Sequence, residues 1–137
     1  MSSTPEHLGL LIKRIQDRQH RQLDAALETL DVSLVQWNAL REIERNPGCS
    51  QHRLAQLTFN SDQAFGTLTT RLMQRGLVER QRGAGRAMAL QLTPLGSSLY
   101  LRGAEIHAKV IGASFASLDE AERQILSDLL TRLLPQD

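Results

Sequence analysis

The sequence lacks the features that mark several classes of protein. It has one cysteine, Cys49, which excludes an internal disulfide framework and is typical of a cytosolic chain. No apolar run approaches the roughly 18 residues that suggest a membrane span. The polar N-terminus, residues 1–7, lacks the charged-then-apolar layout of a signal peptide. With 137 residues, 41% of them hydrophobic, the chain is expected to be one globular domain of the cytoplasm.

The motifs of common catalytic and metal-binding chemistry are also missing. The sequence has no glycine-rich phosphate loop, no Gly-x-Ser-x-Gly elbow and no His-Glu-x-x-His pair. Asp119, Glu120 and Glu122 cluster where a helix is predicted to begin, and acids there complement the helix dipole. Cys49 and His52 form a Cys-x-x-His pair without the second pair that a zinc site needs. We therefore predict no enzyme activity, no metal and no cofactor.

The sequence carries little net charge, but the charge is unevenly distributed. The 16 Lys+Arg and 15 Asp+Glu residues leave +1, which by itself argues against a nucleic-acid-binding protein. Residues 1–60 sum to zero and residues 91–137 to −2, whereas residues 61–90 sum to +3, with five arginines against Asp62 and Glu79. Arginine forms bidentate contacts with phosphate and guanine, so this middle segment is a candidate for contact with DNA. Its arginines are Arg71, Arg75, Arg80, Arg82 and Arg86.

The spacing of apolar residues predicts a mainly helical chain with one small β-hairpin. Helical periodicity runs through residues 6–30 and resumes after Ser33, which forms a capping box with Gln36. Asn46-Pro47-Gly48 ends the second helix. The remaining predicted elements are a short helix after Ser50, a helix over 61–76, strands over 77–82 and 87–92 around the turn Gly83-Ala84-Gly85, a long helix from Thr93-Pro94 to about 116, and a last helix opened by Ser117 and Glu120.

The helix predicted after Ser61 has two unlike faces. Phe65, Leu68 and Leu72 share one side, and the opposite side is polar with no acid after the first turn. Amide, hydroxyl and guanidinium groups hydrogen-bond base edges and phosphates in a major groove, although a solvated surface would also be polar. We predict that Ser61 offers its backbone amide to a phosphate at the helix start. The side chains predicted to face DNA are Gln63, Thr67, Thr70 and Gln74, with Arg71 at their flank.

The predicted hairpin follows this helix directly and holds three of the five arginines around its glycine turn. Arg82 and Arg86 are predicted to contact DNA from the wing. Arg80 lies at its base, where either a DNA contact or a structural role is open. Helix, turn, helix and basic hairpin in this order describe a winged helix-turn-helix. The helical face and the hairpin therefore support the same function, the binding of double-stranded DNA.

Three stretches resemble the MarR family of bacterial transcription regulators. They are Ser-Gln-His-Arg-Leu-Ala-Gln-Leu at 50–57, the run Arg-Leu-Met-Gln-Arg-Gly-Leu-Val-Glu-Arg at 71–80, and residues 86–96, which end in Leu-Thr-Pro-Leu-Gly. The sequence departs from the family pattern at Ala84, where an aspartate is usual, and in a wing turn about two residues shorter.

The resemblance implies a single MarR-like domain over residues 1–137. Its winged-helix core would cover about 33–93, and its dimerisation helices about 6–30 and 94–134. It further implies a homodimeric repressor that binds a pseudo-palindromic operator and is released by a small effector of the phenolic class. The residues themselves support the dimer, because the first helix and the last two hold more leucine and isoleucine than so small a core requires.

Alternative interpretations remain open at this point. A winged helix can serve as a protein-interaction module without DNA, and Cys49 could sense oxidants or be a thiol without function. Trp37, His20 and His107 could line an effector crevice, although core packing is the better explanation for Trp37. We predict no particular ligand-binding residues.

Overall fold

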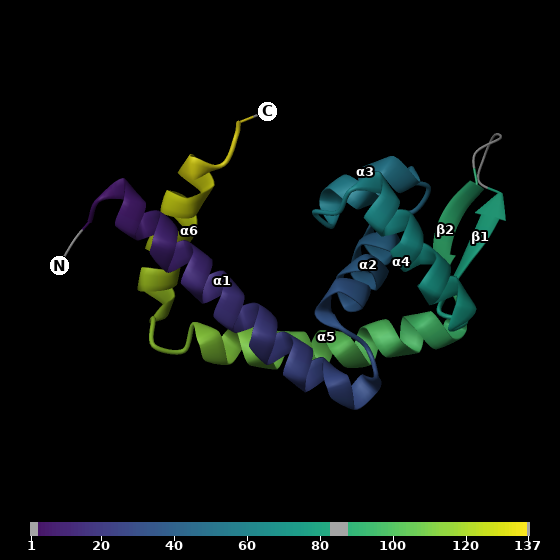
Figure 1. Ribbon diagram of the computed structural model, residues 1–137. Coiled ribbons are helices and arrows are strands. Elements are labelled where there is room, and N and C mark those ends of the chain that lie inside the picture. Colours follow the sequence, from purple (N-terminus) through teal and green to yellow (C-terminus); the bar gives the residue numbers. More distant parts are fainter. Residues whose placement is uncertain (1–2, 83–87, 137) are drawn as a thin grey trace.

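The computed structural model describes residues 3–82 and 88–136, and the fold in these residues is mainly helical with one β-hairpin (Figure 1). The predicted fold class is confirmed. Its elements are α1 (Pro5–Leu27), the short 3-10 helix η1 (Glu28–Leu30), α2 (Leu34–Arg45), α3 (Gln51–Leu57), α4 (Asp62–Gln74), β1 (Val78–Arg82), β2 (Met88–Leu92), α5 (Pro94–Ser114) and α6 (Glu120–Leu133).

Side-chain caps start the helices where the sequence predicts them, with one exception. Ser33 and Gln36 form the predicted capping box. The Ser50 hydroxyl accepts the Arg53 amide of α3, and the Ser61 hydroxyl accepts the Ala64 amide of α4. The prediction that Ser117 opens the last helix is wrong. Asp119 is the cap of α6, because its carboxylate accepts the Glu122 amide at 2.8 Å and the Glu122 carboxylate accepts the Asp119 amide at 2.9 Å.

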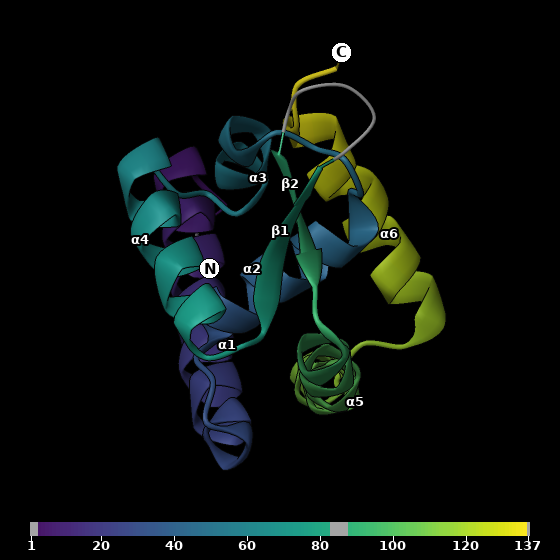
Figure 2. The same cartoon turned by 90° about the vertical axis from the view of Figure 1, so that its right-hand side faces the viewer.

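The helices divide the molecule into two regions (Figure 1). α2, α3, α4 and the hairpin form a lobe at one end of α5, and α1 and α6 lie towards the other end. Figure 2 looks along α5 and shows the hairpin rising from its start. The strands are antiparallel, in a register that runs from Val78 opposite Leu92 to Arg82 opposite Met88. We call α2 to β2 the lobe hereafter.

The core lies inside the lobe and at its contact with α1 and α5. The largest fully buried side chains include Trp37, Phe65, Leu40, Leu54 and Leu72, contributed by α2, α3 and α4. The hairpin joins this core through its inward residues, since Val78, Leu90 and Leu92 are buried. Burial of these apolar faces explains why short helices, which are marginal alone, are stable in the lobe.

A single tryptophan joins the lobe to α5. The Trp37 indole is 2% exposed and donates its Nε1 hydrogen to the Tyr100 carbonyl at 3.1 Å. It stacks on His107, with ring centroids 4.6 Å apart, and the Arg41 guanidinium lies 5.0 Å from its ring centroid. A Cβ atom at Gly103 would overlap the indole, so the close approach requires glycine there.

A second close approach anchors the hairpin to the start of α5 and is testable by substitution. A Cβ at Gly96 would overlap the Leu77 carbonyl oxygen. This is a backbone atom, so rotation of a side chain cannot relieve the overlap. We expect Gly96→Ala to lower the free energy of unfolding by about 1–3 kcal/mol in urea denaturation.

Gly112→Ala is the matched control in the same helix, because a Cβ atom there would meet no other part of the described chain within 4 Å. It should raise stability by up to about 1 kcal/mol, since alanine is the better helix former. Equal effects of the two substitutions would refute the close approach at Gly96.

Candidate nucleic-acid interface

The sequence-predicted DNA-reading helix is α4, the second helix of a helix-turn-helix. α3 and α4 pack together and are joined by a turn in which Phe59 has a positive φ of 60°. The Asn60 amide bonds the Ala55 carbonyl at 2.9 Å and closes the turn. The Ser61 hydroxyl then accepts the Ala64 amide at 3.0 Å and starts α4. Local hydrogen bonds therefore set the angle between the two helices.

The two faces of α4 have the exposure expected from the sequence. Phe65, Leu68 and Leu72 are buried against the lobe. The exposed side chains include all five predicted to face DNA, namely Gln63, Thr67, Thr70, Arg71 and Gln74. The Thr67 and Thr70 hydroxyls donate to the carbonyls of Gln63 and Gly66, so each hydroxyl oxygen keeps lone pairs directed at solvent. We call these five exposed side chains the reading face.

The reading face borders a groove rather than a flat surface. A cavity of about 620 Å³ lies between α4 and the start of α2. Its lining is mixed in polarity, so the groove offers hydrogen-bonding groups beside apolar ones. From α2 and its cap it is lined by Ser33, Val35 and Gln36, and from α4 and its cap by Ser61, Gln63, Ala64, Thr67, Leu68 and Arg71.

The wing is described at its base only. Arg80 is exposed on β1 and donates to the Gln51 side chain of α3 at 3.3 Å. The backbone of Arg82 ends β1, but its side chain lies outside the described residues, as do Ala84 and Arg86 altogether. The contacts predicted for Arg82 and Arg86 therefore stay predictions.

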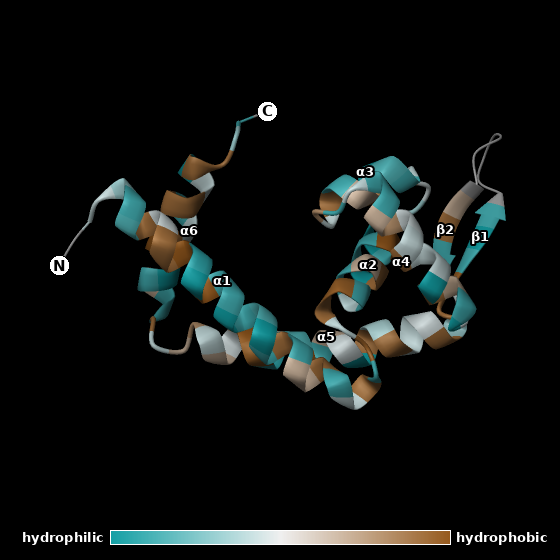
Figure 3. Ribbon diagram, in the orientation of Figure 1, coloured by the Kyte–Doolittle hydropathy of each residue, from teal (hydrophilic) through white to brown (hydrophobic). Residues whose placement is uncertain are grey.

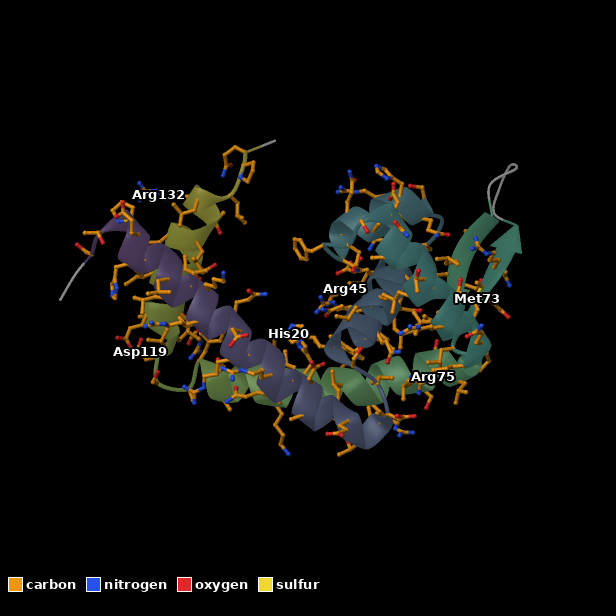
Figure 4. All side chains as sticks on the ribbon, viewed as in Figure 1. His20, Arg45, Met73, Arg75, Asp119 and Arg132 are labelled. Carbon is orange, nitrogen blue, oxygen red and sulfur yellow. The ribbon has the colours of Figure 1, made fainter. Side chains whose placement is uncertain are left out.

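Arg75 has a role that the sequence did not reveal. It is the C-cap of α4 and is half-buried. Its guanidinium lies 3.6 Å from the Asp31 carboxylate and 3.4 Å from the Gln36 side chain, at the base of the lobe (Figure 4). It therefore ties the end of α4 to the connection between α1 and α2. Arg75 belongs to the same cluster in the sequence as the arginines predicted to contact DNA, but its own contacts are within the protein.

The residues considered for other chemistry are dispersed. Trp37 is core, as expected, and Cys49 is half-buried against the core with a free thiol. His20 lies 3.3 Å from Asp24, in the next turn of α1. Within residues 3–82 and 88–136, no group of three or more histidine, cysteine, aspartate or glutamate side chains is placed to hold a metal ion. Over the same residues, no helix has the length and apolarity needed to cross a membrane.

The architecture and the sequence both match known regulators. A family model described as MarR family matches residues 30–87. The HTH-type transcriptional repressor Rv2887 of Mycobacterium tuberculosis is 27% identical over 128 residues, which are 92% of this chain and 92% of that protein. The middle of this chain thus matches the MarR family, and 92% of its length is similar to one HTH-type transcriptional repressor.

Solved structures of MarR-family proteins share the whole fold. The structure of Rv2887 in complex with salicylic acid superposes with a TM-score of 0.78 at 26% identity, covering 97% of this chain and 98% of that chain. A mutant of MarR from E. coli, complexed with operator DNA, superposes with a TM-score of 0.81 at 25% identity, covering 93% of this chain and 94% of that chain. α3, α4 and the β1–β2 hairpin thus belong to a fold that this chain shares with solved MarR-family structures.

The buried side of α4 contains one polar group whose removal is expected to stabilise the lobe. Thr69 is 0% exposed, and its hydroxyl has no hydrogen-bond partner among the described residues. Thr69→Val keeps the shape and removes the buried hydroxyl, so we expect stability to rise by about 1 kcal/mol in thermal or urea unfolding.

Thr70→Val is the matched control on the solvent side of the same helix. Its hydroxyl is exposed and bonded to the Gly66 carbonyl, so we expect a change within about 0.5 kcal/mol. A loss of stability in Thr69→Val would show that its hydroxyl is hydrogen-bonded in solution.

Proposed function

We propose that this chain is a transcriptional regulator of the MarR family, which binds DNA sequence-specifically and acts as a homodimeric repressor. The observation that carries the proposal is the reading face. It is an exposed row of amide, hydroxyl and guanidinium groups on the second helix of a helix-turn-helix, with no acid beyond the first turn. The operator-bound structure of the E. coli relative supports it.

The reading face and the wing have separate tasks in this proposal. Gln63, Thr67, Thr70 and Gln74 contact base edges, and Arg71 contacts a phosphate or a guanine. Ser61 contributes a backbone amide to a phosphate at the start of α4. The wing arginines Arg80, Arg82 and Arg86 add contacts to the DNA backbone.

The apolar faces of α1 and α6 support the dimer. Leu8 and Ile12 on α1 are each 49% exposed, and on α6 Ile125 is 60% and Leu133 73% exposed. Figure 3 shows hydrophobic residues recurring along both helices, away from the lobe. Large exposed apolar residues that recur along two helices are typical of a protein–protein interface. A two-fold interface here would hold two reading faces on successive major grooves of a pseudo-palindromic site.

The regulatory input is a small organic effector of the phenolic class that lowers affinity for the operator. The salicylic acid complex of Rv2887 supports this class of ligand. The protein acts in the cytoplasm, where the DNA is, and as a regulator rather than as an enzyme.

Base reading by the reading face is tested with Thr67→Ala. The preferred duplex is first selected from a random library with the wild-type protein, and binding is measured by fluorescence anisotropy at several salt concentrations. We expect nanomolar wild-type affinity that falls steeply with salt. Thr67→Ala should weaken binding to the selected duplex about fivefold, or about 1 kcal/mol, and leave binding to a scrambled duplex unchanged.

Thr29→Ala is the control for this experiment. Its hydroxyl also donates to a backbone carbonyl, that of Ala26, but it lies on η1 outside the reading face. Equal loss on selected and scrambled duplexes would remove Thr67 from base reading. Failure of the wild type to enrich any sequence would refute the proposed function.

The dimer interface is tested with Leu129→Glu. The residue is 50% exposed in the middle of α6, so the charge is tolerated in a folded protomer but not in an apolar interface. Analytical ultracentrifugation should find a dimer for the wild type and a monomer for the variant. Leu95→Glu, at a residue 59% exposed at the start of α5, should remain dimeric. A dimeric Leu129→Glu protein would place the interface elsewhere.

A further inference from the structure

Two residues outside the predicted set of contacts join the start of α3 to the start of α4. His52 Nδ1 lies 2.8 Å and 3.0 Å from the two carboxylate oxygens of Asp62. Both side chains are mostly in water, at 65% and 67% exposure. An exposed ion pair contributes little stability, so the fold does not explain the pairing well.

The pair lies between the elements that the proposed function assigns to DNA. Asp62 is the first residue of α4, next to Gln63 of the reading face. Gln51, the neighbour of His52 on α3, accepts a hydrogen bond from Arg80 at the base of the wing. The start of α3 is therefore hydrogen-bonded to two neighbours. His52 contacts Asp62 of α4, and Gln51 accepts a hydrogen bond from Arg80 of the wing.

The contacts of the His52 ring decide how the ring is oriented. Among the described residues, Asp62 is its one ion-pair partner. On its own helix, Arg53 directs its guanidinium to Gln56. From β1, Arg80 bonds Gln51, and the α2 arginines Arg41 and Arg45 act on His107. Thus a single carboxylate sets the orientation of the ring.

The contact with Asp62 restricts how the His52 ring can hydrogen-bond a phosphate. Nδ1 faces a carboxylate, which only accepts hydrogen bonds, so Nδ1 carries the hydrogen in the neutral ring as well as in the charged one. In the neutral ring Nε2 then holds a lone pair, which cannot bond a phosphate oxygen. In the protonated ring Nε2 is a donor with positive charge. A phosphate contact by His52 consequently requires the protonated ring.

We propose that His52 is a further phosphate-contacting residue of the DNA-binding face, oriented by Asp62 as a positioning residue, and that DNA binding takes up a proton at this ring. The inference rests on the proposed function and adds a contact to the same face. The imidazolium would lie between the carboxylate and a phosphate, and it would offset the repulsion that an acid at the start of α4 exerts on DNA.

The test is the pH dependence of affinity for the selected duplex, measured by fluorescence anisotropy from about pH 6 to about pH 8 at constant ionic strength. Wild-type affinity should fall as pH rises, approaching tenfold per pH unit for each half-site contacted, which is the limit for uptake of one proton. His52→Gln should bind more weakly at the low end of the range and show a flat profile.

Two further variants separate orientation from folding. Asp62→Ala frees Nδ1, so the neutral ring can turn its hydrogen to the phosphate, and the pH slope should fall to less than half that of the wild type. His7→Gln, at the opposite end of the molecule on α1, should keep the wild-type slope. Circular dichroism verifies that each variant is folded.

The outcomes distinguish the inference from the proposed function. Wild-type binding without a pH slope, or a His52→Gln protein that keeps the wild-type slope, would overturn the role of His52 and leave the proposed function intact. Absence of DNA binding at every pH would overturn both.

Discussion

The position of the lobe relative to α5 depends on the contact between Trp37 and α5. The lobe carries the reading face, and α5 connects it to the apolar helices proposed to form the dimer. Trp37 lies against α5 at Gly103, where no side chain separates the indole from the helix backbone. Its hydrogen bond to the Tyr100 carbonyl and its stacking on His107 give this contact one orientation. In a two-fold dimer, the angle of this contact sets the distance between two recognition helices.

The groups around Trp37 also determine the charge of His107. Burial of the ring, and then the positive charges of Arg41 and Arg45, lower the pKa of His107. The ring is consequently neutral near pH 7 and stacks on the indole without adding a third positive charge. Protonation in acid favours the unfolded chain, so the contribution of this stack to stability is lost as pH falls below the usual range of histidine. The contact between Trp37 and α5 is thus most stable with a neutral His107, whereas the proposed phosphate contact of His52 on α3 requires a protonated ring.

The sequence predicts the elements well because they depend on local chemistry. The two faces of α4 follow from helical spacing alone, and Ser33, Ser50 and Ser61 cap the helices that follow them. Ser117 is a plausible cap for the same reason, but α6 begins after Asp119. The Asp119 carboxylate and the Glu122 carboxylate each accept the other residue's backbone amide, which completes both hydrogen bonds of a capping box.

The features that could not be predicted join residues far apart in the chain. Arg75 lies within a cluster of arginines, and only the folded chain brings it to Asp31 and Gln36. His52 and Asp62 are ten residues apart, and their contact depends on the angle of the turn between α3 and α4. The position of an arginine in the sequence likewise does not reveal whether its side chain is free to bind a partner, since Arg75 and Arg41 make contacts within the protein.

The exposed face of α4 is the part of the molecule proposed to contact DNA. This proposal is tested most directly by mapping backbone amide chemical shifts in the NMR spectrum of the labelled protein as the selected duplex is added. DNA contact through α4 should give the largest shifts along α4 (Asp62–Gln74) and at the start of α3, with small shifts at the core side of α5. Largest shifts along α1 and α6, with α4 unchanged, would contradict it.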